Sequence, residues 1–226
     1  MITKENLRDV LKYLGYKETK NVFKKDFDHG ASIEVNFNTQ KITYAPLDSS
    51  FTEGLFPTKE KPAKGFVIHR STTLDFIHNE NFVCLISVHF LLEKGYKPKH
   101  IVFEPAFKVG HNNKPSYGDI LVFDKEYKPL VLIENKTYVN EFSKEWNLMQ
   151  KDGGQLFSYL GPLVNQLGVC ENLVLFASDF DEANIIYKSH IITLKDNKKR
   201  INELNTNQTF DQAQGKYYEV WSETYG

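Results

Sequence analysis

The sequence predicts an α/β (α+β) fold in which a central mixed β-sheet is flanked by helices. Two neighbouring apolar runs, at residues 117–124 and 129–136, have the length and the aliphatic composition of strands buried on both faces. Apolar segments at residues 79–95 and 142–160 have the length and pattern of helices. Aromatic residues, which favour sheets, are abundant, with 12 Tyr and 17 Phe in the chain.

Residues 1–78 are expected to form an N-terminal extension made of a helix and a β-meander. Apolar residues on one face predict a helix over residues 3–14. Alternating apolar and polar residues, separated by turn-forming residues, predict three strands. These strands comprise residues 21–27, 31–38 and 41–45. Prolines and glycines interrupt any period in residues 47–75, which predicts an ordered but irregular connection.

Residues 79–195 are expected to form the core domain. The helix at residues 79–95 is apolar on almost every side, so we expect it to be buried. A strand at residues 100–108 follows it and precedes the two apolar runs. Within the later helix, Gly153-Gly154 predicts a break, and Gly161-Pro162 is expected to end it. Two further strands are predicted at residues 172–178 and 185–194.

Residues 196–226 are expected to be a C-terminal segment that leads into further chain. A charged stretch at residues 196–204 predicts a short helix. An aromatic-rich run, including Tyr217, Trp221 and Tyr225, lies next to the last residue. This pattern suggests that the chain is a fragment of a longer protein.

The composition narrows the classes of function. The formal net charge is -1, so nucleic-acid binding would depend on a local basic patch rather than on a global positive field. No apolar run approaches the roughly 20 residues that a membrane-spanning helix needs, and no membrane partner is expected. Cys84 and Cys170 lie within apolar segments, and we interpret them as buried free thiols. Such thiols suit a reducing compartment, which predicts a cytoplasmic location.

Charged residues lie at one end of each apolar run. Asp119 stands where the first run begins, and Glu134 and Lys136 stand where the second run ends. If the four residues between the runs form a hairpin turn, these three side chains meet at one rim of the sheet, where the first strand begins and the second ends. Burying such charges is costly unless a counter-charge compensates, and a divalent cation would do so. Asp119 and Glu134 would then bind Mg²⁺, with the Asn135 carbonyl as a third ligand, and Lys136 would orient or deprotonate a water molecule.

A second pair of polar residues lies on the helix that follows. Gln155 and Tyr159 are four residues apart, so they share one face of that helix. An amide and a phenol in this position could hold a phosphate group or steady a general base. Together with the three hairpin residues they predict a site for phosphodiester hydrolysis.

These residues resemble the PD-(D/E)xK nuclease superfamily. The resemblance rests on Gly118-Asp119, on Ile133-Glu134-Asn135-Lys136, and on Gln155 with Tyr159. The chain is most similar to the endonuclease domain of the motor subunits of type I, or fused type I-like, restriction enzymes. The proline of the superfamily's motif is not adjacent to the aspartate, since Pro115 lies four positions before it.

The resemblance implies a restriction-endonuclease-like fold and a Mg²⁺-dependent deoxyribonuclease in which Mn²⁺ can replace Mg²⁺. The implied catalytic residues are Asp119, Glu134, Lys136, Gln155 and Tyr159. The implied partners are double-stranded DNA and the methyltransferase and specificity subunits of a restriction system. The chain has no phosphate-binding loop of the type Gly-x-x-x-x-Gly-Lys-Ser/Thr, so ATP would be used only by a region outside it.

Four further residues have two interpretations each. Glu80 could belong to the site or could simply favour the N-terminus of its helix. Glu104 could contribute to the site or could be a solvated strand residue. His111 and Lys114 could contact the DNA backbone or belong to a solvated loop.

Two alternative functions remain open from the sequence. The chain could be a stand-alone repair or junction-resolving nuclease, for which no motor region would be needed. It could also be a catalytically inactive member of the fold that binds nucleic acid without cutting it. Metal-dependent cleavage distinguishes the second alternative from the other hypotheses.

Overall fold

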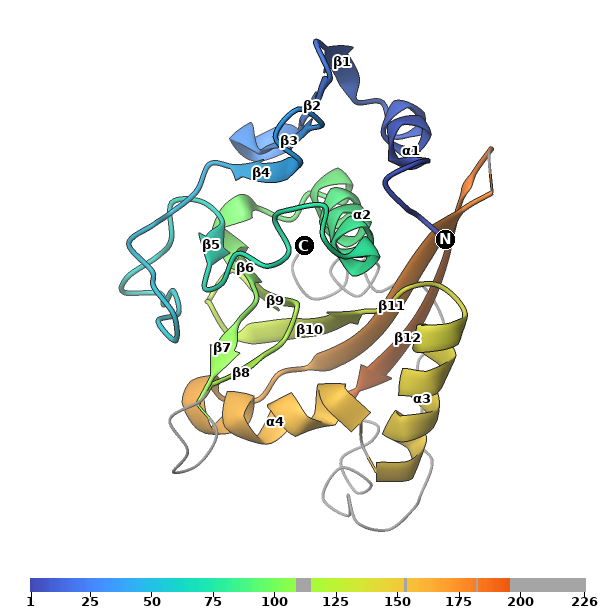
Figure 1. The fold of residues 1–226 in the computed structure, drawn as a ribbon. Helices are drawn as coiled ribbons and strands as arrows, with labels where there is room; N and C mark the ends of the chain where they lie inside the picture. Colours follow the sequence, from blue (N-terminus) through green and yellow to red (C-terminus); the bar gives the residue numbers. More distant parts are fainter. Residues whose placement is uncertain (109–114, 153, 182, 196–226) are drawn as a thin grey trace.

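The computed structural model describes residues 1–108, 115–152, 154–181 and 183–195 (Figure 1). Its main feature is a six-stranded sheet with the strand order β12-β11-β10-β9-β6-β5. The strands are β5 (Val67–Ile68), β6 (Ile101–Phe103), β9 (Ile120–Phe123), β10 (Pro129–Asn135), β11 (Asn172–Phe180) and β12 (Ile185–Thr193). The pairs β10–β11 and β5–β6 are parallel and the other pairs are antiparallel, so the sheet is mixed as predicted.

Helices cover both faces of this sheet (Figure 1). Helix α2 (Asn79–Glu93) packs on one face, and α3 (Asn140–Asp152) and α4 (Gly154–Leu167) pack on the other. Side chains alternate along each strand, and in β9 Ile120 points to the α2 side while Leu121 points to the opposite side. A strand buried on both faces needs apolar residues at every position, which is why the hairpin strands are continuous apolar runs.

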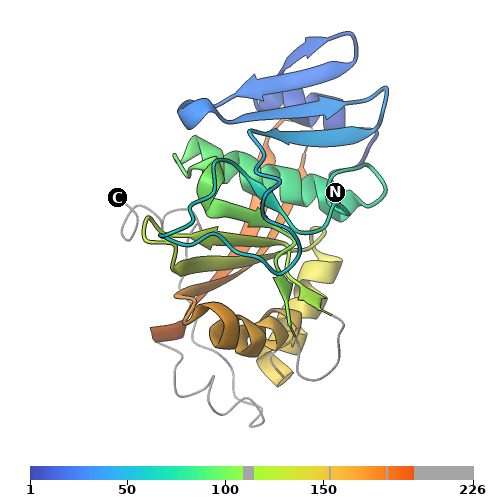
Figure 2. The same cartoon turned by 90° about the vertical axis from the view of Figure 1, so that its left-hand side faces the viewer.

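The N-terminal part of the chain forms a second, smaller sheet. Helix α1 (Leu7–Tyr13) precedes an antiparallel sheet in the order β1-β2-β3-β4. Its strands are β1 (Lys17–Thr19), β2 (Val22–Asp26), β3 (Ser32–Asn36) and β4 (Lys41–Ala45). Figure 2 shows this sheet on the side of α2 that faces away from the main sheet. Because α2 lies between two sheets, nearly all of its surface is buried, which explains its lack of a polar face.

The structure changes several predicted boundaries. The first helix begins at Leu7 rather than at residue 3. The strand predicted at residues 100–108 is divided into β6 and β7 (Ala106–Phe107), because the backbone of Glu104 turns the chain with a φ of 44°. Strand β7 pairs with β8 (Ser116–Tyr117) in a separate two-stranded sheet.

The prediction that Gly161-Pro162 ends a helix is wrong. Helix α4 continues to Leu167 with Pro162 inside it. A proline within a helix costs about 3 kcal/mol. Here Leu163 is completely buried beyond the proline, in line with the apolar face formed by Leu156 and Leu160. Burial of this continuous face outweighs the cost of the proline.

The predicted boundary between the N-terminal extension and the core domain, at residue 79, does not match the limits of the main sheet. Strand β5 lies in the stretch assigned to the N-terminal extension, yet it pairs with β6 and forms one end of the six-stranded sheet. Within the described ranges no helix is long and apolar enough to cross a membrane. Cys84 and Cys170 are buried and have free thiols. The predicted helix at residues 196–204 and the rest of the segment 196–226 lie outside the described residues.

Candidate active site

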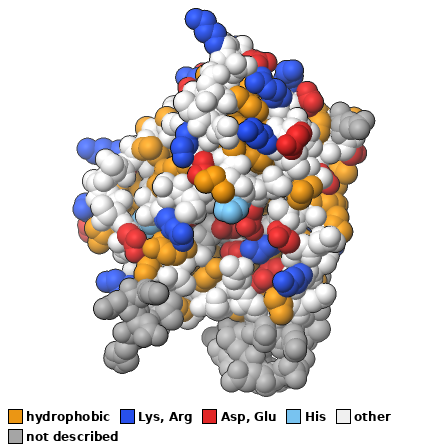
Figure 3. Space-filling model, in the orientation of Figure 1, with side chains coloured by type: hydrophobic (Ala, Val, Ile, Leu, Met, Phe, Trp, Pro, Cys, Tyr) orange, Lys and Arg blue, Asp and Glu red, His pale blue; other side chains and the backbone are white. Residues whose placement is uncertain are grey.

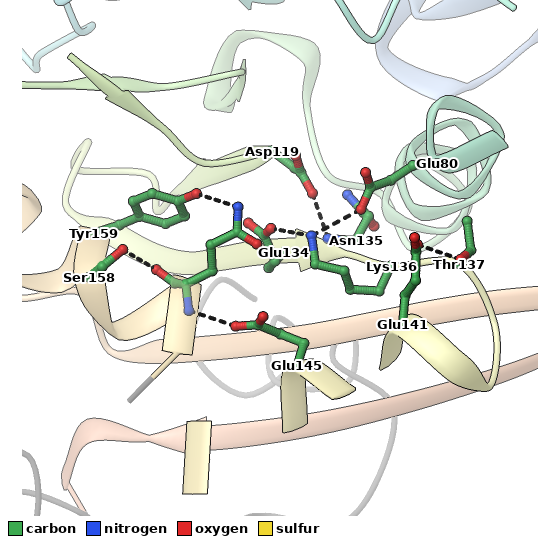
Figure 4. A network of polar contacts seen from close by, with 11 residues as sticks. Glu80, Asp119, Glu134, Asn135, Lys136, Thr137, Glu141, Glu145, Ser158 and Tyr159 are labelled. Atoms are coloured by element: carbon green, nitrogen blue, oxygen red, sulfur yellow. Dashed lines mark hydrogen bonds and ion pairs between the residues drawn. The ribbon is translucent and has the colours of Figure 1, made fainter. Parts of the chain in front are cut away.

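The β9–β10 hairpin places the predicted acidic residues side by side. Ile120 at the start of β9 pairs with Ile133 near the end of β10. The residues that flank this pair therefore meet at the open end of the hairpin. The Oδ2 atom of Asp119 accepts a hydrogen bond of 2.6 Å from the backbone N–H of Asn135 (Figure 4). The predicted hairpin is therefore confirmed, and its backbone fixes the carboxylate of Asp119 beside the Glu-Asn-Lys sequence.

Lys136 joins the hairpin to α2. Its Nζ atom lies 2.6 Å from Oε1 of Glu134 and 3.0 Å from Oε1 of Glu80, which belongs to the first turn of α2 (Figure 4). Glu80 thus lies in the site as well as at a helix N-terminus, so both interpretations of this residue describe the same position. The face of the molecule seen in Figure 3 shows acidic side chains gathered around a basic one where β10 ends beside α2.

Gln155 and Tyr159 lie on α4 with their side chains in contact. The Nε2 atom of Gln155 donates a hydrogen bond of 3.0 Å to the Tyr159 hydroxyl, as expected for residues one helical turn apart. The Tyr159 side chain is buried, and Figure 4 shows it on the Glu134 side of the site. The structure therefore brings the five predicted catalytic residues together at the end of the β9–β10 hairpin that lies opposite its turn.

Glu145 is a residue of this region that sequence reasoning missed. It lies on α3, it is buried, and its Oε1 atom accepts a hydrogen bond of 2.6 Å from the backbone N–H of Gln155. The carboxylate satisfies an N–H group that the start of α4 would otherwise leave unpaired. Gly154 makes this approach possible, because a Cβ atom there would lie 2.5 Å from Glu145 Oε1 and its φ is +54°. The glycine pair in the sequence signals the new helix start, but nothing in it identifies the capping residue.

Burial and crowding of like charges raise the pKa values of both hairpin carboxyls. Burial, followed by the charge of Glu80, raises the pKa of Asp119 to about 7. Burial, followed by the charge of Asp119, raises the pKa of Glu134 well above its usual range. Lys136 partly offsets both effects but does not cancel them. Both carboxyl groups therefore favour a proton, or a cation in its place, more strongly than an exposed carboxyl group does.

The other two polar side chains respond to the same charges. Burial opposes the charged form of Lys136, but Glu134, Glu80 and Asp119 outweigh it and raise the pKa of the ammonium group. Burial and then the negative charge of Glu134 raise the pKa of Tyr159. Lys136 is therefore a cation, and Tyr159 a neutral hydroxyl, at neutral pH.

The donor set fits a divalent cation in part. Glu134 is buried, and its Oε2 atom has no hydrogen-bond partner among the described residues. Both side-chain amide atoms of Asn135 likewise lack partners in this part of the chain. A buried carboxylate oxygen without a donor is costly, and a hard cation would satisfy it. The described ranges contain no group of three or more His, Cys, Asp or Glu side chains placed to hold a metal ion, so backbone or water oxygens would have to complete the coordination.

Glu104 is close to the site but its carboxylate is held elsewhere. Its Oε1 atom accepts hydrogen bonds from the Thr73 N–H (2.8 Å) and the Thr73 hydroxyl (3.0 Å). Its Oε2 atom accepts a hydrogen bond of 2.6 Å from the Thr72 hydroxyl. The interpretation of Glu104 as a solvated strand residue is wrong, since it is 3% exposed and its carboxylate ties a loop to the sheet. His111 and Lys114 lie outside the described residues.

Comparison of the chain with protein-family models and with curated proteins gives no match.

Proposed function

We propose that the chain is a metal-dependent DNA endonuclease domain that hydrolyses phosphodiester bonds at the edge formed by Asp119, Glu134 and Lys136. The observation that carries the proposal is the ion-pair network in which Lys136 lies between Glu134 and Glu80, beside the half-buried Asp119. This arrangement concentrates negative charge that favours a cation, next to an ammonium group suited to a phosphate oxygen.

Each residue has a definite part in this proposal. Asp119 and Glu134 would hold Mg²⁺, or Mn²⁺ in its place, with the Asn135 carbonyl as a further ligand. A bound cation supplies charge neutralisation at the phosphate and at the leaving oxygen. Lys136, which is paired with Glu134 and Glu80, would orient the attacking water and stabilise developing negative charge.

The α4 residues and Glu80 complete the site. The Tyr159 hydroxyl keeps its proton, and it can donate a hydrogen bond to a phosphate oxygen while it accepts one from Gln155. Glu80 holds the second side of the Lys136 ammonium group and so fixes the direction in which the lysine points.

The restriction-endonuclease-like assignment and the biological setting are part of the same proposal. The motif resemblance favours a domain of a type I restriction motor subunit, acting on double-stranded DNA with methyltransferase and specificity partners. In that setting ATP hydrolysis and sequence choice belong to other regions, and this edge only cuts. The absence of a phosphate-binding loop from the sequence is consistent with that division of labour.

Cleavage of supercoiled plasmid DNA tests the proposal. The purified chain should nick or linearise plasmid in Mg²⁺ or Mn²⁺ and should be inactive in EDTA. Asp119→Asn, which keeps the size of the side chain but removes its charge, should reduce the rate by roughly a hundredfold to a thousandfold. Glu126→Gln is the matched control, since Glu126 is exposed in the turn at the opposite end of the hairpin. A wild-type chain without metal-dependent cleavage, alone and with partner subunits, would contradict the hydrolytic function.

A further inference from the structure

Arg70 is an exposed cation whose guanidinium group contacts two side chains, those of Glu104 and Tyr117. It follows the edge strand β5, and its side chain is 51% exposed. Its guanidinium carbon lies 4.9 Å from the centroid of the Tyr117 ring. Its Nε atom lies 3.8 Å from Oε2 of Glu104. Stacking and the ion pair together restrict the orientation of the guanidinium group.

The support for Arg70 is itself rigid. Glu104 is buried, and Thr72 and Thr73 donate three hydrogen bonds to its two carboxylate oxygens. These contacts fix residues 70–73 to the end of β6. A carboxylate saturated in this way is a structural anchor, and only its weaker contact with Nε is directed at the arginine.

The same anchor connects Arg70 with the site. The backbone N–H of Glu104 donates a hydrogen bond of 2.8 Å to the carbonyl of Asp119. Tyr117, on which Arg70 stacks, lies two residues before Asp119 in the chain. Arg70 is therefore held through both Glu104 and Tyr117 against the segment between β8 and β9 that carries the candidate catalytic aspartate.

We propose that Arg70 binds a backbone phosphate of the DNA strand that enters the active site, with Glu104 and Tyr117 as its positioning residues. The inference rests on the proposed nuclease function and names a part of its DNA-binding surface. Arginine suits this role because its planar fork matches two phosphate oxygens while one face stacks on an aromatic ring. Its ion pair with Glu104 is made through Nε, and half of its side chain is exposed to solvent.

The test measures DNA binding separately from cleavage. A fluorescently labelled duplex is titrated with protein in EDTA across a series of salt concentrations. Loss of one phosphate contact should reduce the slope of log K against log salt concentration by about 0.9 and weaken binding roughly tenfold near 0.1 M salt. Arg70→Ala should show both effects, and Arg70→Lys should keep most of the slope but lose part of the affinity.

Lys24→Ala provides the matched control. Lys24 is also 51% exposed and also pairs with a carboxylate, at 3.1 Å from Asp26, but it lies on β2 of the N-terminal sheet. Its removal should leave the salt slope unchanged. Thermal unfolding of each variant shows whether any loss of binding comes from loss of the fold.

The outcomes separate this inference from the proposed function. An Arg70-dependent salt slope in a chain that does not cut DNA would support the phosphate contact and reject the nuclease. Normal cleavage with an unchanged slope in Arg70→Ala would overturn the phosphate contact alone. A wild-type chain that binds no DNA, or an equal effect of Lys24→Ala, would also overturn it.

Discussion

Glu104 and Glu134 are two buried glutamates that lie beside the start of β9, and their carboxylate oxygens differ in their hydrogen bonds. Phe103 pairs with Ile120, which pairs with Ile133, so the residues that follow β6 and end β10 flank the start of β9. The side chain of Glu104 is 4% exposed and that of Glu134 is 2% exposed. Burial alone therefore does not distinguish a structural from a functional carboxylate.

The hydrogen bonds of the two residues make the distinction. Both oxygens of Glu104 accept hydrogen bonds from threonines, whereas Oε2 of Glu134 has no partner among the described residues. Glu134 contacts the Lys136 ammonium group through Oε1 only. We infer that Glu104 stabilises the edge, and that the unsatisfied oxygen of Glu134 is kept for a ligand.

The largest expected effect is on DNA cleavage, and it concerns Lys136, the partner of Glu134. Replacement of Lys136 by methionine keeps most of the length of the side chain and removes its charge. The site would then lack the ammonium group that stabilises developing charge, and Glu134 and Glu80 would lose their shared partner. We expect plasmid cleavage to slow by roughly a thousandfold. Lys24→Met is the control, and equal rates for Lys136→Met and the wild type would remove Lys136 from the mechanism.

The second prediction concerns the stability of variants in which Glu104 or Glu134 is replaced. Glu104→Ala leaves three donors of Thr72 and Thr73 without their acceptor, and it should lower the free energy of unfolding by about 3 kcal/mol. Glu134→Ala should cost only about 1 kcal/mol, because Lys136 keeps Glu80 as a partner and an unsatisfied oxygen disappears. Urea unfolding of both variants measures the difference. If Glu134→Ala were the more destabilising change, the assigned roles would be reversed.

A buried base far from the edge provides a comparison for pH. His89 lies on α2 against Tyr16, and burial followed by the charge of Lys25 lowers its pKa to about 3. The unfolded chain binds a proton at this residue below about pH 6.5, whereas the folded chain does not. Its contribution to stability is therefore complete above about pH 6.5 and is lost as the pH falls towards 3.

At pH 5 this linkage should reduce the free energy of unfolding by about 2 kcal/mol relative to pH 7. Urea unfolding of His89→Gln across this pH range should show a correspondingly weaker acid dependence. His29→Asn is the control, because His29 is exposed in a turn with a φ of 58° that asparagine tolerates. The same acid dependence in His89→Gln and the wild type would show that His89 is not the source of the loss of stability at low pH.

The smallest expected effect concerns the cap of α4. Glu145→Ala removes the acceptor of the Gln155 N–H and should lower the free energy of unfolding by about 1 kcal/mol. Glu145→Gln keeps a side-chain oxygen in the same place and should recover most of that stability. An alanine variant as stable as the wild type in urea would show that the contact does not cap the helix.

The hairpin and its charged ends were predictable because they depend on local patterns. Apolar runs joined by a short turn fix the pairing of β9 with β10, and that pairing brings Asp119 next to Asn135. The helical spacing of Gln155 and Tyr159 likewise determines their contact. Sequence alone was therefore sufficient for the parts of the site that lie on one hairpin or one helix.

The remaining features depend on packing between distant segments. The pairing of Glu80 with Lys136 requires α2 to lie against the end of β10, and the anchoring of Glu104 requires Thr72 and Thr73 to lie against its carboxylate. The continuation of α4 through Pro162 depends on the burial of Leu163 against other elements. No local pattern encodes these contacts.

The most direct test of the central claim compares Glu134→Gln with the wild type in a plasmid-cleavage assay with Mg²⁺ or Mn²⁺. The amide keeps the shape of the side chain but removes the charge whose Oε2 atom is unsatisfied in this structure. Our account predicts metal-dependent cleavage by the wild type and a loss of roughly a thousandfold or more in a variant that remains folded. Equal cleavage by the two proteins, or none by the wild type with its partners present, would contradict it.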